Sequence, residues 1–312
     1  MAKAIRDVYG ESLIKYGKNN ERVVVLDADV SSSTKSGLFG KECPERFFNC
    51  GICENAMMGM AAGFAIGGKI PFVNTFAVFI STIGAVATRT FLSYSGLNVK
   101  LMGGYSGLSA GYDGPTHHVF EDLAIMRAMP GMTVMVASDE AITDWMVKTA
   151  IETEGPLYVR LSREASPDCH TAGGGFELGK GYVAREGRDA TVIACGVLVS
   201  EALRAAQTLA GEGIELKVVD MFCVKPLDEA LVLECARETG AIVTAEEHNV
   251  LGGLGSAVAE TLVKNDAFVP VEMIGMQDTH AESGPYAGLL AKYGMDAAAI
   301  AEAVKRAVKR KK

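Results

Sequence analysis

The chain has 312 residues, of which 49% are hydrophobic and 22% charged, and its formal net charge is −8. This composition excludes a disordered chain, and the negative charge argues against a nucleic-acid-binding surface. No apolar run reaches the ~18–20 residues of a membrane span, and the first residues lack the apolar region of a secretory signal. We therefore expect a cytoplasmic metabolic protein. The 35 glycines follow no strict period, which is typical of tight turns and of backbone that approaches a ligand.

The first half of the chain alternates short apolar runs with segments of helix length. The expected strands are residues 23–26, 70–75, 99–102, 132–136 and 157–160. The expected helices are residues 54–66, 78–94, 119–128 and 139–152. Such alternation predicts a mostly parallel sheet that helices cover on both faces.

A polar, glycine-rich stretch near residues 173–175 interrupts this alternation, and a second series follows. Its expected strands are residues 190–194, 215–220, 241–245 and 271–274. Its expected helices are residues 200–212, 227–239, 254–264 and 296–309. We predict an α/β fold of two three-layer α/β/α domains with mostly parallel sheets. The first domain would span residues 1–170, a linker 171–187, and the second domain 188–312.

Seven cysteines are an odd number, and several lie in apolar segments. The favoured interpretation is reduced cysteines packed as small hydrophobic residues. Cys50 and Cys53 form a single CxxC, which could be a redox pair or half of a zinc site. No second CxxC accompanies it, so incidental small residues at a strand-to-helix turn are the preferred interpretation.

Glu54 begins a stretch in which residues 55–66 carry no charge. It is either a first-turn acid favoured by the helix dipole or a functional carboxylate in apolar surroundings.

A long loop follows the expected strand 99–102. It contains Asp113 and the adjacent His117 and His118. In α/β proteins such loops carry ligand sites, and these residues suit acid/base chemistry or hydrogen bonding to substrate hydroxyls. A polar turn before the next helix is the structural alternative. A metal site on the two histidines is disfavoured, because adjacent side chains of an extended segment point apart.

Two further patterns have structural and functional interpretations. Phe76 and Phe79 are either ordinary core residues or an apolar wall for a ring. The segment Gly252-Gly253-Leu254-Gly255, after Glu246-Glu247-His248, matches only part of GxGxxG. A tight strand-to-helix crossing is therefore favoured there over a nucleotide site.

Together these residues resemble the C-terminal part of transketolases over nearly the whole chain. The shared motifs are Pro44-Glu45-Arg46-Phe47-Phe48-Asn49, Gly51-Ile52-Cys53-Glu54-Asn55, Thr75-Phe76, Asp113-Gly114-Pro115-Thr116-His117, Leu161-Ser162-Arg163, Glu246-Glu247-His248-Asn249, Gly252-Gly253-Leu254-Gly255 and Glu282-Ser283-Gly284. The family has a pyrophosphate-binding, a pyrimidine-binding and a C-terminal domain, and this chain resembles the last two. It lacks a GDG…N motif. The resemblance therefore implies a split transketolase, whose N-terminal pyrophosphate-binding subunit would hold Mg²⁺ and the diphosphate of a shared thiamine diphosphate.

The resemblance also assigns roles in cofactor binding. Glu54 matches the glutamate that hydrogen-bonds the aminopyrimidine and favours the tautomer that removes the thiazolium proton. Phe79 matches the aromatic residue that stacks on the pyrimidine, and Phe76 belongs to the same pocket. No metal ligand is expected on this chain.

Substrate contacts follow from the same resemblance. His117 matches a histidine near the reacting centre, and Asp113 an aspartate that recognises a substrate hydroxyl. Positions that grip the sugar phosphate correspond to Arg6, Ser33 and Arg163. Asp29 opens the loop that carries Ser33 and is expected to support it.

Two departures bear on the substrate. The family commonly has histidine where this chain has Tyr105, and glutamate where it has Tyr112. The preferred sugar, or its anionic end group, is therefore open, although the resemblance implies transfer of a two-carbon ketol unit between sugar phosphates.

The sequence also allows two alternatives to a catalytic split transketolase. One is the β-type subunit of a 2-oxoacid dehydrogenase decarboxylating component, and the other is a non-catalytic partner subunit. In this family the cofactor lies where domains of different protomers meet. We therefore expect homodimerisation and a dimer of heterodimers.

Overall fold

A seven-stranded sheet forms the centre of the first domain in the computed structural model, which describes residues 2–170 and 173–311. The strand order is β10-β5-β6-β4-β3-β1-β2, and only β10 (Cys223–Lys225) is antiparallel to its neighbour. The strands of the first half are β1 (Val23–Asp27), β2 (Phe47–Asn49), β3 (Ile70–Phe76), β4 (Lys100–Gly104), β5 (Thr133–Val136) and β6 (Leu157–Arg160). The five strands other than β2 and β10 are almost wholly buried, as expected for a sheet covered on both faces.

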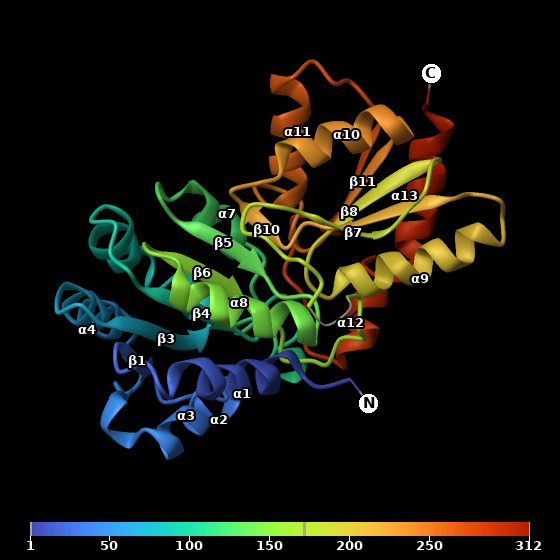
Figure 1. Cartoon of the computed structure of the whole chain (residues 1–312). Helices are drawn as coiled ribbons and strands as arrows, with labels where there is room; N and C mark the ends of the chain where they lie inside the picture. The colour runs from blue at the N-terminus through green and yellow to red at the C-terminus, as the bar shows by residue number, and fades with distance from the viewer. Residues whose placement is uncertain (1, 171–172, 312) are drawn as a thin grey trace.

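Helices cover both faces of this sheet (Figure 1). They are α1 (Ile5–Gly17), α2 (Ser31–Thr34), α3 (Gly37–Glu42), α4 (Glu54–Ile66), α5 (Ala77–Ser81), α6 (Ala85–Ala87), α7 (Asp122–Ala128) and α8 (Glu140–Glu152). Three short irregular helices are η1 (Pro44–Arg46), the π-helical η2 (Thr88–Ser93) and η3 (Gly111–Asp113). α1 packs on α8, while α4 lies on β3.

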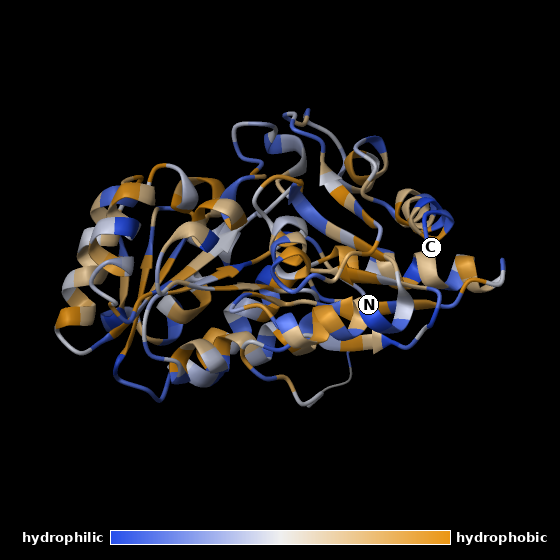
Figure 2. Ribbon diagram, turned by 90° about the horizontal axis from the view of Figure 1, so that it is seen from above, coloured by the Kyte–Doolittle hydropathy of each residue, from blue (hydrophilic) through white to orange (hydrophobic). Residues whose placement is uncertain are grey.

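The second domain has a five-stranded sheet in the order β12-β11-β8-β9-β7. Its strands are β7 (Tyr182–Arg185), β8 (Ala190–Ala194), β9 (Leu216–Asp220), β11 (Ile242–Asn249) and β12 (Val271–Met276). Only the edge strand β7 is antiparallel to its neighbour. The helices are α9 (Leu198–Ala210), α10 (Glu229–Thr239), α11 (Leu254–Lys264), α12 (Tyr286–Lys292) and α13 (Ala297–Lys309). Figure 2 shows orange, hydrophobic segments along the strands and on the helices around them.

The two domains share a packed boundary. Strand β10 (Cys223–Lys225) comes from the second half of the sequence but pairs with β5 of the first sheet. One buried apolar cluster contains residues of both domains, such as Val136 and Met221. At the carboxyl end of β9, Asp220 contacts His170, so the carboxyl edge of the second sheet faces the first domain.

The predicted fold class, two α/β/α domains with mostly parallel sheets, is confirmed. The strands expected in both series are present, and α4 has the predicted bounds of 54–66. In the segment predicted as a linker, residues 171–172 lie outside the described residues. The remainder contains β7, which pairs with β9 and so belongs to the second sheet.

The single helix predicted over residues 78–94 is wrong. The segment is divided into α5, α6 and the π-helical η2. Ser81 and Thr82 hydroxyls donate to the carbonyls of Ala77 and Val78, at 2.8 and 2.6 Å, and such bonds compete with regular helix geometry. Gly84 then donates its N–H to the carbonyl of Phe79, five residues back, which breaks the α-helical pattern.

The helix predicted over residues 119–128 begins later, at Asp122. Val119 instead forms an isolated antiparallel bridge with Gly107, which closes the base of the preceding loop. Helix α1 has no counterpart among the predicted elements. Its buried face includes the small or polar Gly10, Ser12 and Gly17, so the apolar periodicity is weak.

Among the described residues, none of the helices is both long and apolar enough to cross a membrane.

Candidate active site

The candidate site lies at the carboxyl edge of the first sheet. Strands β1, β3 and β4 run parallel and in register, with Asp27 opposite Asn74 and Phe76 opposite Gly104. The loops that follow parallel strands therefore emerge together, which is where α/β sheets bind ligands. These loops carry most of the predicted site residues.

Four aromatic rings gather at this edge, and we call them the aromatic cluster: Phe76, Phe79, Tyr105 and His117. Phe76 is stacked on Tyr105 with ring centroids 4.2 Å apart and on Phe79 at 5.8 Å. The His117 ring meets Phe76 and Phe79 edge-on, at 5.8 and 5.5 Å. Residues far apart in sequence thus form one apolar wall, of the kind that can hold a planar ring.

Glu54 begins α4 and is only 5% exposed. The Thr75 hydroxyl donates a hydrogen bond to Glu54 Oε1 at 3.4 Å, and Thr75 immediately precedes Phe76 of the aromatic cluster. A buried carboxylate with one long hydrogen bond has capacity to accept more. The structure therefore connects Glu54, through Thr75, with the aromatic cluster.

Two arginines flank Tyr105. The guanidinium carbons of Arg6 and Arg163 lie 5.6 and 5.3 Å from the Tyr105 ring centroid. Nη1 of Arg6 donates to the Tyr105 hydroxyl at 2.6 Å and to the Ser33 carbonyl at 3.4 Å. Nε of Arg6 is buried without a hydrogen-bond partner in the described part of the chain. Tyr105 itself has a left-handed φ of 57°, which is strained for a bulky residue and is typical of functional positions.

The remaining predicted residues surround this centre. Ser33 contacts Arg6 through its carbonyl rather than its hydroxyl. Asp113 is exposed on η3, and the Thr116 hydroxyl lies 3.0 Å from Nδ1 of His117. Tyr112, the second departure from the family pattern, is 73% exposed.

Asp27 is the carboxylate that holds the Ser33 loop by hydrogen bonds, and the sequence did not point to it. Asp27 accepts hydrogen bonds from Val30 N–H at 2.6 Å and from the hydroxyls of Thr34 and Ser36 at 2.9 and 2.7 Å. Burial raises the pKa of Asp27, although these donors oppose the rise. An aspartate at the end of an apolar strand and before a serine-rich turn is a sequence signal for this role. Asp29 is exposed and accepts from Asn49 instead.

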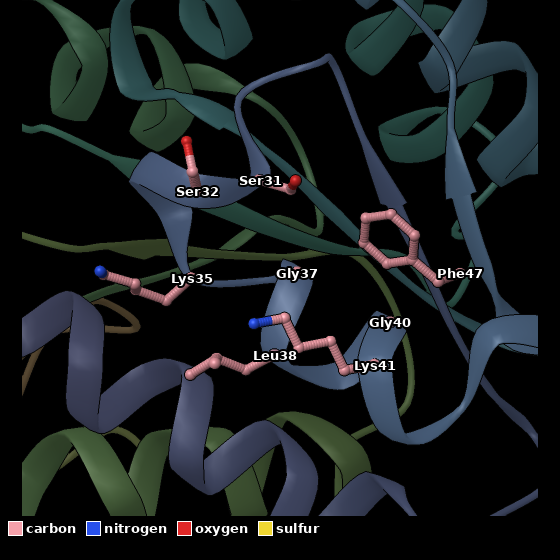
Figure 3. A pocket seen from close by; sticks show the side chains of 8 residues that line it. All are labelled: Ser31, Ser32, Lys35, Gly37, Leu38, Gly40, Lys41 and Phe47. Carbon is pink, nitrogen blue, oxygen red and sulfur yellow. The ribbon is translucent and has the colours of Figure 1, made fainter.

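A pocket of about 510 Å³ lies beside the Ser33 loop (Figure 3). Its lining comes from α2, Lys35, α3 and Phe47 of β2, and it includes none of the predicted site residues. Nζ of Lys35, which also lines the pocket, lies 3.3 Å from Oδ1 of Asp7, so this ammonium group already has an acidic partner.

The glycine-rich segment 252–255 is a tight strand-to-helix crossing, as predicted. Glu246 accepts hydrogen bonds from the N–H groups of Leu254 and Gly255, at 2.7 and 2.8 Å, at the start of α11. A Cβ on Gly253 would lie 2.0 Å from Glu246 Oε2. Because a carboxylate already occupies the helix N-terminus, the segment offers no phosphate site.

All seven cysteines are free, and Cys43, Cys195, Cys223 and Cys235 are buried, in agreement with packed thiols. Burial raises the pKa of the Cys50 thiol, whereas a reactive thiol needs a lowered pKa.

The rings of His117 and His118 pack on different partners. The centroid of the His118 ring lies 6.1 Å from that of Phe120, whereas His117 packs on Phe76 and Phe79.

A buried polar network at the domain boundary was also missed from the sequence. Arg160 Nε lies 2.7 Å from Asp122 Oδ2, and the Tyr158 hydroxyl donates to the same oxygen at 2.6 Å. Arg160 Nη2 also donates to the backbone carbonyl of Glu247 at 2.7 Å. Burial raises the pKa of Glu247 to about 7, although Arg160 opposes the rise. This network joins the first sheet to β11.

The fold and this site define a protein with a pyrimidine-binding domain followed by a C-terminal domain of transketolase type. Residues 1–168 match the family model of the transketolase pyrimidine-binding domain, and residues 179–300 match that of the transketolase C-terminal domain. The chain belongs to the transketolase family and corresponds to the C-terminal section of a split transketolase.

Its relatives include proteins of similar length. A transketolase C-terminal section of Methanocaldococcus jannaschii is 41% identical over 99% of this chain and 97% of the relative. The 6-deoxy-6-sulfo-D-fructose transketolase subunit of Clostridium sp. (strain MSTE9) is 40% identical over 98% of this chain and 95% of the relative. Rat transketolase is 39% identical, and the match covers 97% of this chain but 48% of that protein.

A solved structure of similar length shares the fold. The split-gene transketolase described as an inactive beta4 tetramer has a TM-score of 0.92 and 46% identity, with 99% of both chains covered. The transketolase of Leishmania mexicana has a TM-score of 0.82, covering 99% of this chain and 46% of that one. At 24% identity, this second likeness concerns the fold alone.

Proposed function

We propose that this chain is the C-terminal subunit of a two-chain, thiamine-diphosphate-dependent transketolase. It would transfer a two-carbon ketol unit between a ketose and an aldose that carry an anionic end group. The main support is the pair Arg6 and Arg163 around Tyr105, beside the aromatic cluster. A part-buried guanidinium is suited to an anion that arrives with the substrate, because its planar fork can bind two oxygen atoms.

The residues present fit the pyrimidine half of thiamine diphosphate. The Glu54 carboxylate is buried and carries one long hydrogen bond from Thr75, so it can accept another from a ring N–H group. Phe76 and Phe79 provide an apolar wall for the ring. When bound, the cofactor supplies the electron sink that carbon–carbon bond cleavage next to a carbonyl requires.

The chain's own side chains then orient the substrate. His117, held edge-on against Phe76 and Phe79, is the histidine that would hydrogen-bond or exchange a proton with a substrate oxygen. Asp113, exposed on η3, would accept a hydrogen bond from a substrate hydroxyl. Arg6, Ser33 and Arg163 would hold the anionic end, and Asp29 lies at the start of the same loop.

The partner would be an N-terminal pyrophosphate-binding subunit that holds Mg²⁺ and the diphosphate. In the described ranges, no group of three or more His, Cys, Asp or Glu side chains is arranged to hold a metal ion. Relatives named as sections or subunits support a two-chain enzyme.

A second copy of this chain would complete the assembly as a dimer of heterodimers. Large apolar side chains are exposed on α4, on η2 and next to them: Ile52, Met60, Ile66, Ile83, Val86, Phe91 and Tyr94. We call this region the apolar surface. It begins beside Glu54 and spans elements that pack on each other, and exposed apolar area of this kind marks interaction sites.

The proposal specifies a ketose with an anionic end group but not the individual sugar. The relatives include a 6-deoxy-6-sulfo-D-fructose transketolase subunit and, in Phocaeicola vulgatus, a subunit of an apulose-4-phosphate transketolase. Their names show that similar chains serve sugars with different anionic groups.

The test is reconstitution with a pyrophosphate-domain partner, using Glu54→Gln and the control Glu229→Gln. Glu229 also begins a helix, α10, but its side chain is 50% exposed. We expect the wild-type and Glu229→Gln complexes to transfer ketol units and Glu54→Gln to lose at least a hundredfold in kcat. Lipoyl-dependent decarboxylation would instead identify a 2-oxoacid dehydrogenase component. A complex that binds no thiamine diphosphate in calorimetry would identify a non-catalytic partner.

A further inference from the structure

One buried carboxylate of the second domain holds the loop that carries Asp113 and His117. Glu247 Oε1 accepts a hydrogen bond from the backbone N–H of Leu108 at 2.6 Å. Glu247 Oε2 accepts one from the Tyr286 hydroxyl at 3.2 Å. Glu247 and Leu108 are 3% and 0% exposed, so water does not compete for this contact. In such buried surroundings a hydrogen bond is electrostatically stronger than in water.

The loop backbone approaches Glu247 so closely that only glycine fits at position 107. Gly107 has a φ of +58°, and a Cβ there would lie 2.4 Å from Glu247 Cδ. The carboxylate thus contacts the main chain of the loop directly, with no intervening side chain.

Backbone hydrogen bonds connect Leu108 and its neighbour Ser109 with two predicted substrate-binding residues, Asp113 and Arg163. The Leu108 carbonyl accepts from the Gly111 N–H at 2.8 Å, and Gly111 opens η3, which contains Asp113. The neighbouring Ser109 hydroxyl accepts from the backbone N–H of Arg163 at 3.1 Å. The position of Leu108 therefore affects both the turn that presents Asp113 and the main chain at Arg163.

The second domain contacts the same loop at two more points. The Gly284 N–H donates to the Gly111 carbonyl at 3.4 Å. A Cβ on Gly114 would lie 2.3 Å from the Ser283 hydroxyl oxygen, so Ser283 packs directly against the backbone of Gly114. These contacts are a long hydrogen bond and a steric contact, whereas Glu247 accepts a short, buried hydrogen bond.

We propose that Glu247 is a positioning residue, through which the second domain sets the geometry of the loop that presents Asp113 and His117. The roles of those two residues rest on the proposed function, but the contact with Leu108 belongs to this chain alone. The second domain supplies none of the predicted catalytic or substrate-binding side chains. Its contribution to turnover would thus be to hold this loop.

Hydrogen exchange on the chain without its partner tests the contact. Glu247→Ala removes the acceptor, Glu247→Gln keeps an oxygen that can accept from Leu108, and Glu302→Gln is the control. Glu302 is 64% exposed on α13, a helix that packs on α9 and β12. We expect the amides of residues 105–118 to exchange at least tenfold faster in Glu247→Ala. In Glu247→Gln and Glu302→Gln they should exchange within threefold of wild type.

Steady-state kinetics of the reconstituted complex tests the positioning role. We expect kcat to fall at least tenfold in Glu247→Ala and to return to within threefold in Glu247→Gln. The affinity for thiamine diphosphate should change less than kcat, because Glu54, Phe76 and Phe79 lie outside residues 105–118. If Glu247→Ala does not fold, Glu247→Asp, which is one methylene shorter, takes its place.

Two results would overturn the proposal. One is unchanged exchange of residues 105–118 in Glu247→Ala, and the other is wild-type kcat despite faster exchange. A wild-type complex without ketol transfer would instead refute the proposed function and with it the positioning role. The exchange measurement would still establish whether Glu247 holds the loop.

Discussion

The hydroxyl of Tyr105 lies 2.6 Å from Nη1 of Arg6, and the same ring stacks on Phe76. Tyr105 therefore joins the wall predicted to hold the cofactor ring to the arginine predicted to hold the anionic end of the substrate. Its left-handed backbone carries a strain of order 1–3 kcal/mol. The stacking and the hydrogen bond to Arg6 offset that strain.

Tyr105→Phe isolates the contribution of this hydroxyl. The ring and its stacking remain, but Arg6 loses the partner that fixes its orientation. Since a hydrogen bond to a charged group contributes about 1.5–3 kcal/mol, we expect KM for an anionic ketose to rise roughly tenfold or more, with a smaller change in kcat. A panel of phosphorylated, sulfonated and uncharged ketoses with the reconstituted complex measures this. An equal effect on charged and uncharged ketoses would contradict the role.

The domain boundary gives a pH-dependent prediction through His170. Nδ1 of His170 lies 2.9 Å from Asp139 Oδ2 of the first domain, and Nε2 lies 3.3 Å from Asp220 Oδ2 of the second. Burial lowers the pKa of His170, but the hydrogen bonds and charges of the two aspartates outweigh it and raise the pKa to about 9. A pKa raised on folding means that the protonated form stabilises the folded state.

This stabilisation is present in full below the unfolded-state pKa of 6.5 and is lost as the pH rises through 9. We expect the free energy of unfolding to fall by about 3 kcal/mol across that window. Urea titrations between pH 6 and 10 give the free energy of unfolding of wild type and of His170→Gln at each pH, and the two pH dependences are compared. The same pH dependence in both proteins would show that His170 is not charged in the folded protein.

The apolar surface predicts the oligomeric state. Val86 is 75% exposed within this surface, so Val86→Lys would place a charge in the interface between two copies. We expect light scattering to show a smaller assembly at the same concentration. Val263→Lys is the matched control, because Val263 is 64% exposed on α11, outside the apolar surface. A monomeric wild-type chain, or an unchanged mass for Val86→Lys, would refute self-association through this surface.

The sequence predicted the elements whose patterns are local. Helix α4 has its predicted bounds because Glu54 opens an uncharged stretch rich in alanine and methionine, and β1 and β3 each begin with a run of four apolar residues. The resemblance pointed to Arg6, Phe76 and Tyr105, and the structure brings them together although 99 residues separate Arg6 from Tyr105.

What the sequence could not predict depends on pairs that are distant in the chain. Glu247 contacts Leu108 across 139 residues, and His170 contacts Asp139 and Asp220 from both domains. No periodicity or spacing encodes such pairs, because the packing of the two domains creates them. The break of the helix predicted over 78–94 likewise depends on hydroxyl groups that bond their own backbone.

The crossing from β11 to α11 yields a prediction of stability. Gly253 has φ −84° and ψ −142°, a pair outside the main regions allowed to L-residues, so its backbone conformation also disfavours alanine. Its Cβ would lie 2.0 Å from Glu246 Oε2 and 2.7 Å from Nδ1 of His248, both on the buried strand β11. Alanine must therefore displace the carboxylate that accepts from Leu254 and Gly255, leaving a buried charge with fewer donors.

We expect Gly253→Ala to lower the free energy of unfolding by about 2–4 kcal/mol, as is usual when a buried charged network is broken. Gly63→Ala is the control, because Gly63 lies within α4 and a Cβ there meets nothing within 4 Å. That change should stabilise the chain by about 0.5–1 kcal/mol, since alanine favours helix over glycine. Denaturant titration of both variants measures the difference. Equal stability of Gly253→Ala and wild type would mean that Glu246 does not hold the start of α11.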